Sequence, residues 1–124
     1  MQGLPLGMDF TPLMNRYIEM LRITKFHVHF LLNDDKPKRR DVWIDAATTL
    51  IFTETNKKSI IITDLRTEGG VLCRLLGLTI EKASRRDDGG LLLELSTGVR
   101  LEVLNDYPNY ESVIIHVGKD VFVG

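Results

Sequence analysis

The chain has 124 residues, of which 44% are hydrophobic and 27% are charged, and its formal net charge is −1. This size supports one domain with its own core. No apolar run reaches the roughly 20 residues that a membrane helix needs, and the near-neutral charge argues against nucleic-acid binding driven mainly by electrostatics. The start of the chain has no signal-peptide pattern, and the single cysteine excludes an internal disulfide, so we expect a cytoplasmic protein.

The first predicted element is a helix over residues 12–22. Thr11 is a suitable N-cap, and Pro12 stands at the first helical position, where its missing N–H costs nothing. Apolar side chains then recur at a spacing of four residues, at Leu13, Tyr17 and Leu21. This spacing is typical of one face of a helix that packs on a sheet.

Strands are predicted for most of the remaining chain, because short apolar or alternating segments lie between turn signals. These segments cover residues 26–30, 42–44, 48–53, 59–63, 78–86, 91–95, 99–104, 112–117 and 121–123. A short helix is expected near residues 68–76, with leucines at helical spacing and Gly77 as its stop. The sequence therefore predicts an α+β fold, mainly antiparallel β-sheet with about eight strands, an N-terminal helix and a short mid-chain helix.

The two halves of the chain resemble each other weakly. Residues 20–24 align with 75–79, and residues 49–52 align with 92–95. Two repeated units would then span about 11–66 and 67–124, each a helix followed by a β-meander. Short apolar runs also align by chance, so duplication and coincidence both remain open. Either way we expect one domain over residues 1–124, because neither half could bury its own sheet face.

No motif predicts catalysis, a metal or a cofactor. His27 and His29 share one side of a predicted strand, a spacing that zinc can use, but His116 is the only further histidine. We therefore expect two solvated histidines. Cys73 lies in an apolar setting without the signals of a reactive thiol, and we expect it to be buried and inert. The motifs of serine hydrolases, phosphate-binding loops and zinc proteases are all missing, so we do not expect an enzyme.

Charge is distributed unevenly along the chain. Residues 1–62 hold nine Lys and Arg against seven Asp and Glu, whereas residues 63–124 hold seven against ten. An acidic second half suits a basic partner. The densest basic run lies in the first half, between aspartates that nearly cancel its charge, which favours a solvated loop over a nucleic-acid contact. This run contains Lys36, Lys38, Arg39 and Arg40.

Residues 106–111 form the most unusual segment, with two tyrosines, two carboxylates and a proline between two predicted strands. Exposed tyrosine beside acidic residues is typical of a protein-recognition loop, because tyrosine offers a large contact area at low entropic cost. The alternative is that one tyrosine caps the core and Pro108 ends a strand. The sequence favours neither interpretation.

The C-terminal part of the chain resembles a group of small bacterial proteins. The resemblance rests on a Leu-x-Leu strand, a Gly-centred turn and a Leu-x-Val strand within residues 90–103, followed by the Tyr110-Glu111 pair. A Leu-Gly-x-x-Ile strand start over residues 76–80 precedes them. Similar proteins occur among the immunity proteins of polymorphic toxins, including the contact-dependent growth-inhibition type. Their pattern usually continues with a tryptophan after the Tyr-Glu pair, where this chain has Ser112 and Val113.

The resemblance, which covers roughly residues 75–124, implies a stoichiometric inhibitor of a cognate toxin domain, often a nuclease. For its contact surface we select the two most polar turns of the C-terminal half: Asp87, Asp88, Asp106, Tyr107, Tyr110 and Glu111. A duplicated helix-plus-meander sheet also resembles single-stranded nucleic-acid-binding proteins of the whirly type. That alternative would use the basic run and nearby aromatic residues and would bind in a salt-dependent way.

Overall fold

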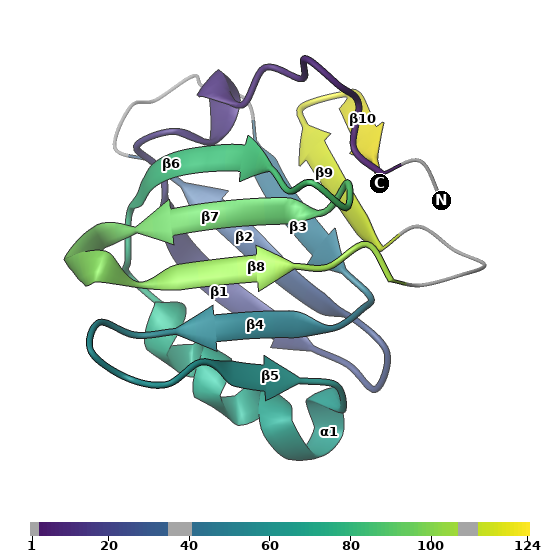
Figure 1. Ribbon diagram of the computed structural model, residues 1–124. Helices are drawn as coiled ribbons and strands as arrows, with labels where there is room; N and C mark the ends of the chain where they lie inside the picture. Colours follow the sequence, from purple (N-terminus) through teal and green to yellow (C-terminus); the bar gives the residue numbers. More distant parts are fainter. Residues whose placement is uncertain (1–2, 35–40, 107–111) are drawn as a thin grey trace.

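The structure, a computed structural model, describes residues 3–34, 41–106 and 112–124. These residues form ten strands in two five-stranded antiparallel sheets that face each other (Figure 1). Sheet A has the strand order β1 (Tyr17–Ile23), β2 (Val28–Asn33), β3 (Val42–Ala46), β9 (Val113–Val117) and β10 (Asp120–Val123). Sheet B has the order β5 (Ile60–Ile62), β4 (Leu50–Thr53), β8 (Arg100–Val103), β7 (Leu91–Leu95) and β6 (Ile80–Arg85).

The core lies between the two sheets, because inward and outward side chains alternate along the strands. Sheet A contributes Phe30 and Ile44, and sheet B contributes Phe52 and Leu101, all of them fully buried. They belong to one hydrophobic cluster that draws on both sheets. The predicted antiparallel β-structure is thus confirmed, with ten strands in place of about eight.

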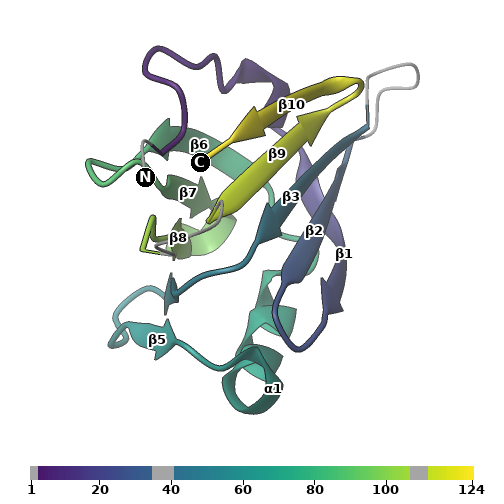
Figure 2. The same cartoon turned by 90° about the vertical axis from the view of Figure 1, so that its right-hand side faces the viewer.

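Helical structure is short. One α-helix, α1 (Leu65–Glu68), runs into the 3-10 helix η2 (Gly69–Leu75), and together they lead from β5 to β6 below the sheets (Figure 2). Two more 3-10 turns, η1 (Thr11–Leu13) and η3 (Ser96–Gly98), complete the list within the described residues. The mid-chain helical segment therefore starts three residues before the predicted boundary. Within the described part of the chain, none of the helices has the length and apolar character needed to cross a membrane.

The predicted N-terminal helix over residues 12–22 is wrong. After η1 the chain enters strand β1, which pairs with β2 from Tyr17 to Ile23. A spacing of four residues also places side chains on one face of a strand, so the apolar pattern could not distinguish the two. A β-bulge between Ile18 and Met20 further obscures the period-two alternation of this strand.

The strand order shows an approximate two-fold relationship within the chain. Sheet A combines the meander β1-β2-β3 with the hairpin β9-β10, and sheet B combines the meander β6-β7-β8 with the hairpin β4-β5. Each half of the chain thus builds a meander in one sheet and sends its following hairpin into the other. Strands β1 to β5 correspond in this way to strands β6 to β10.

The seam between β1 and β6 repeats this relationship at the level of hydrogen bonds. The Ile18 N–H donates to the carbonyl of Leu78 at 3.0 Å, and the Ile80 N–H donates to the carbonyl of Arg16 at 2.8 Å. Ile18 and Ile80 each precede a β-bulge. The structure therefore equates residue 18 with residue 80, a register that differs from the alignment of residues 20–24 with 75–79. Descent of the halves from a duplication stays a prediction.

Candidate functional site

The outward-facing side chains of sheet A form two rows, and each row crosses all five strands. Register pairing places every member directly opposite the next one on the neighbouring strand. The first row, here called the Trp43 row, contains Met20, Leu31, Trp43, His116 and Val121. The second, the Asp45 row, contains Arg22, His29, Asp45, Ile114 and Val123.

Large apolar side chains stand exposed along the Trp43 row. Met20 is 47% exposed, Trp43 48% and Val121 51%. The ring of His116 meets the indole of Trp43 edge-on, with ring centroids 5.6 Å apart. Scattered apolar residues are normal on a protein surface, but a contiguous group of them marks an interaction site.

The Asp45 carboxylate lies between two imidazoles, one from His29 in its own row and one from His116 in the Trp43 row. Nδ1 of His29 contacts Oδ1 of Asp45, and Nε2 of His116 lies 3.2 Å from Oδ2. His27 stacks almost parallel to His29, with ring centroids 6.1 Å apart. The strands therefore gather all three histidines of the chain on this face. The sequence predicts that His29 is solvated, but the structure pairs it with Asp45.

In the parts of the chain that the structure describes, no group of three or more His, Cys, Asp or Glu side chains is placed to hold a metal ion. The two imidazoles instead bind opposite oxygens of one carboxylate. They fix the Asp45 side chain, which is 19% exposed, at the centre of the sheet. The cluster gives the face a rigid polar centre next to its apolar row.

The outer face of sheet B provides an internal comparison, since the two-fold relationship equates its positions with those of sheet A. Arg100 corresponds to Trp43, and Glu102 corresponds to Asp45. Glu102 pairs with Arg86 at 2.6 Å and with Arg100 at 3.5 Å. The equivalent of the exposed tryptophan is thus part of an ion-pair network. The two faces share a scaffold and differ in chemistry.

A hollow of about 790 Å³ adjoins Trp43 at the end of the face where β9 turns into β10. The main-chain carbonyl of Asp41 accepts a hydrogen bond from the Gly118 N–H at 2.8 Å, which joins this turn to the start of β3. The hollow combines an aromatic ring, an aliphatic side chain and two carboxylates. Its lining consists of Leu31, Asp41, Trp43, Gly118, Lys119 and Asp120.

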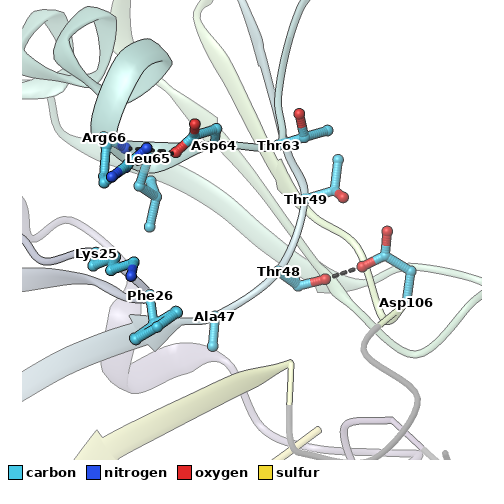
Figure 3. Close-up of a pocket in the computed structure, with 10 residues that line it drawn as sticks. All are labelled: Lys25, Phe26, Ala47, Thr48, Thr49, Thr63, Asp64, Leu65, Arg66 and Asp106. Atoms are coloured by element: carbon cyan, nitrogen blue, oxygen red, sulfur yellow. Dashed lines mark hydrogen bonds and ion pairs between the residues drawn. The ribbon is translucent and has the colours of Figure 1, made fainter.

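A second hollow, of about 580 Å³, is lined by residues that precede β2, follow β3 and begin α1, together with Asp106 (Figure 3). Its charged groups already interact with their neighbours. Asp64 accepts a hydrogen bond from the Arg66 N–H at 3.1 Å and caps α1, and Asp106 accepts one from the Thr48 hydroxyl. Lys25 lies over the ring of Phe26, with Nζ 5.2 Å from the centroid.

Of the contact residues selected from the sequence, Asp87 and Asp88 lie in the turn between β6 and β7 and have different roles. Asp87 is exposed. The Asp88 carboxylate accepts hydrogen bonds from the Gly90 N–H at 2.8 Å and the Asn105 N–H at 3.2 Å, and Arg86 Nε lies 3.2 Å away. Partial burial by itself raises the pKa of Asp88, but these hydrogen bonds and the Arg86 charge outweigh it and hold the pKa below its ordinary value. Asp88 therefore organises the turn.

The other selected residues are placed only in part. Asp106 lines the second hollow, next to Asn105, whose side-chain amide donates to the Asp88 carbonyl at 2.9 Å. The structure thus places Asp88 against Asn105, the residue before Asp106. Tyr107, Tyr110 and Glu111 lie outside the described residues.

Sequence reasoning missed the face of sheet A and misplaced one side chain. Trp43 stands between the buried Val42 and Ile44 in a short alternating strand, and this alternation was the available signal. The expectation of a buried Cys73 is wrong, because the thiol side chain is exposed. In a 3-10 helix, residues three apart share a face, so Leu72 and Leu75 turn inward and Cys73 turns outward.

Comparisons with protein-family models, with curated protein sequences and with solved structures found no match to this chain.

Proposed function

We propose that this protein is an immunity protein, which binds a cognate bacterial toxin domain in the cytoplasm and neutralises it stoichiometrically, without catalysis. The observation that carries the proposal is the outer face of sheet A. It presents a row of exposed apolar side chains beside a polar cluster, whereas the positions of sheet B that correspond to Trp43 and Asp45 carry the ion pair of Arg100 and Glu102. Protein-binding surfaces combine exposed apolar side chains with polar groups beside them, and this face offers both.

Trp43 is the natural anchor of such a surface. Tryptophan is enriched among the residues that contribute most to binding, and here it lies in the middle of a five-stranded sheet. A sheet is also a rigid platform, so little ordering entropy is lost when the partner binds. The resemblance of residues 75–124 to immunity proteins, and the acidic second half of the chain, are consistent with a basic toxin such as a nuclease.

The test is protection from the toxin encoded next to this gene. The toxic domain of a large secreted protein encoded immediately upstream is expressed in cells with the wild-type chain or with the Trp43→Ala variant. We expect growth with the wild-type chain, loss of protection with Trp43→Ala, and a one-to-one complex by light scattering. The Ile61→Ala variant is the matched control, because Ile61 is 58% exposed on the other sheet.

Two outcomes would contradict the proposal. One is a toxin that still kills in the presence of the wild-type chain and forms no complex with it. The other is salt-dependent binding of a single-stranded oligonucleotide with unchanged protection by the Trp43→Ala variant. That result would favour the whirly-like alternative, whose expected basic residues Lys36, Lys38, Arg39 and Arg40 lie outside the described residues.

A further inference from the structure

We propose that two copies of this protein pair through strand β5 and form a symmetric dimer, in which sheet B continues from one copy into the other. The two β5 strands run antiparallel in this dimer, with Ile61 of one copy opposite Ile61 of the partner subunit. The proposal concerns the edge of sheet B, and it goes beyond the proposed binding of a toxin by the outer face of sheet A.

Strand β5 is the outermost strand of sheet B (Figure 1). It pairs with β4 along one side, and no described strand pairs with its other side. Proteins usually protect such an edge with charged residues, proline or a bulge inside the strand. Residues 60–62 are three consecutive isoleucines, without any of these features. Ile60 is 39% exposed and Ile61 58%, so the edge carries apolar surface that a neighbouring strand would cover.

The edge also offers backbone hydrogen-bonding groups, and the register of sheet B shows which residue supplies them. The Leu104 N–H donates to the carbonyl of Thr49 at 3.0 Å, so Thr49 turns its backbone groups toward the β8 side. Successive residues of an antiparallel strand turn these groups to opposite sides, so Leu50 turns toward β5, where it lies opposite Ile62. Ile62 therefore faces β4, and its neighbour Ile61 presents its N–H and C=O to the open edge.

The groups on either side of Ile61 select the register of the dimer. The Thr63 N–H already donates to Oε1 of Glu68 at 3.0 Å, which limits how far a second strand can extend the ladder. Antiparallel pairing centred on Ile61 keeps this bond and forms two hydrogen bonds between the Ile61 residues of the two copies. The same register places Lys58, three residues before Ile61, opposite Asp64 of the partner subunit, three residues after it.

This charge pattern favours a second copy as the occupant of the edge. Lys58 is exposed and makes no ion pair within the described residues. The Asp64 side chain is 47% exposed, although its Oδ1 caps α1 by accepting from the Arg66 N–H. A two-fold axis repeats the contact between lysine and aspartate on both sides of the centre, so the segment is complementary to itself. Parallel pairing would place like charges together.

The experiment measures the oligomeric state of the full chain by sedimentation equilibrium between about 5 µM and 1 mM. Only a few residues of each copy take part, so we expect a weak dimer with a Kd of about 100 µM. Ile61→Lys places like charges opposite each other and should raise the Kd at least tenfold, and Ile61→Glu should do the same. An equimolar mixture of these two variants should form a heterodimer at least tenfold tighter than either homodimer.

Two further variants test the register and the location. Lys58→Glu should weaken the dimer at least threefold, because it faces Asp64 of the partner subunit with a like charge. Leu6→Lys is the matched control and should dimerise like the wild-type chain. Leu6 is 85% exposed, and it follows Leu4, whose N–H donates to Gly89 in the β6–β7 turn, away from β5. Circular dichroism checks that all variants are folded.

Three outcomes would overturn the proposal: a monomeric wild-type chain at 1 mM, an Ile61→Lys dimer as tight as the wild type, or a mixture without heterodimer. These failures are separable from failure of the proposed function. The Trp43 row lies on the outer face of the other sheet, so a dimer would bind two toxin domains and keep the one-to-one ratio. Protection by a monomeric chain rejects only the dimer, and dimerisation without protection rejects only the toxin assignment.

Discussion

In the turn between β6 and β7, Asp88 accepts hydrogen bonds and Asp87 is exposed, and this difference in role can be tested by mutation. Asp88→Ala removes three hydrogen bonds, from the N–H groups of Gly90 and Asn105 and from Arg86 Nε. The Asp88 side chain is 35% exposed, so solvent weakens each interaction, and we assign each about 0.5–1 kcal/mol. The variant should therefore lose about 2 kcal/mol of unfolding free energy. For a domain of this size, that loss lowers the Tm by roughly 8 °C.

Thermal and urea unfolding measure this effect, and Asp87→Ala is the matched control. Asp87 makes no hydrogen bond or ion pair with any residue in the described ranges, so its replacement should change stability by less than about 0.5 kcal/mol. If the two variants are equally stable, the hydrogen bonds of Asp88 do not stabilise the turn. If Asp87→Ala weakens toxin binding while Asp88→Ala mainly lowers stability, only the first belongs to the contact surface selected from the sequence.

The same carboxylate makes a signed prediction for pH. The pKa of Asp88 is lower in the folded chain than its ordinary value of 3.8. Its ionised form therefore stabilises the fold above about pH 4, and this contribution disappears as the pH falls through the lower, folded-state pKa. The difference in unfolding free energy between the wild-type chain and Asp88→Asn should shrink between about pH 5 and pH 2. A difference that stays constant over this range would refute the assignment.

Substitutions at three further positions test the packing. Gly77 (φ 84°) corresponds by the two-fold relationship to Asn15 (φ 65°), so Gly77→Asn should cost less than about 1 kcal/mol and Gly77→Val clearly more, as measured by urea unfolding. Gly90→Ala would place a methyl group on the carbonyl oxygen of Val103, and we expect a Tm at least about 8 °C lower. The Leu93→Ala variant should lose roughly 2–5 kcal/mol of unfolding free energy, because it truncates a core side chain that is only 1% exposed.

Most strands could be predicted because their signal is local. The segment from Leu91 to Leu95 alternates between buried and half-buried residues, and the glycines before it mark its turn. The sequence of Tyr17–Ile23 predicts a helix, because a spacing of four residues suits both a helix and a strand. Pairing with β2 and the seam with β6 make this segment a strand, and neither can be recognised in a short window of sequence.

The candidate site was harder to predict, because its members are distant in sequence. Trp43 and His116 face each other only because β9 crosses from the second half of the chain to lie beside β3. Charged turns are a more visible signal in the sequence, but the Asp88 carboxylate in one of them accepts hydrogen bonds from main-chain groups of its own turn and of the next loop. An exposed tryptophan in an alternating strand is a weaker signal, since the same pattern occurs where the outward residue has no function.

The two-fold relationship allows the outer faces of the two sheets to be compared position by position. Both sheets have the same strand order and both bury the same kind of inner face, so the fold imposes no need for their outer faces to differ. On sheet B the central outward positions carry Arg100 and Glu102, which pair in a way that suits contact with water. On sheet A the same positions carry Trp43 and Asp45. Trp43 is 48% exposed and does not belong to the buried core. Its place at the centre of one face therefore supports the protein partner that we propose.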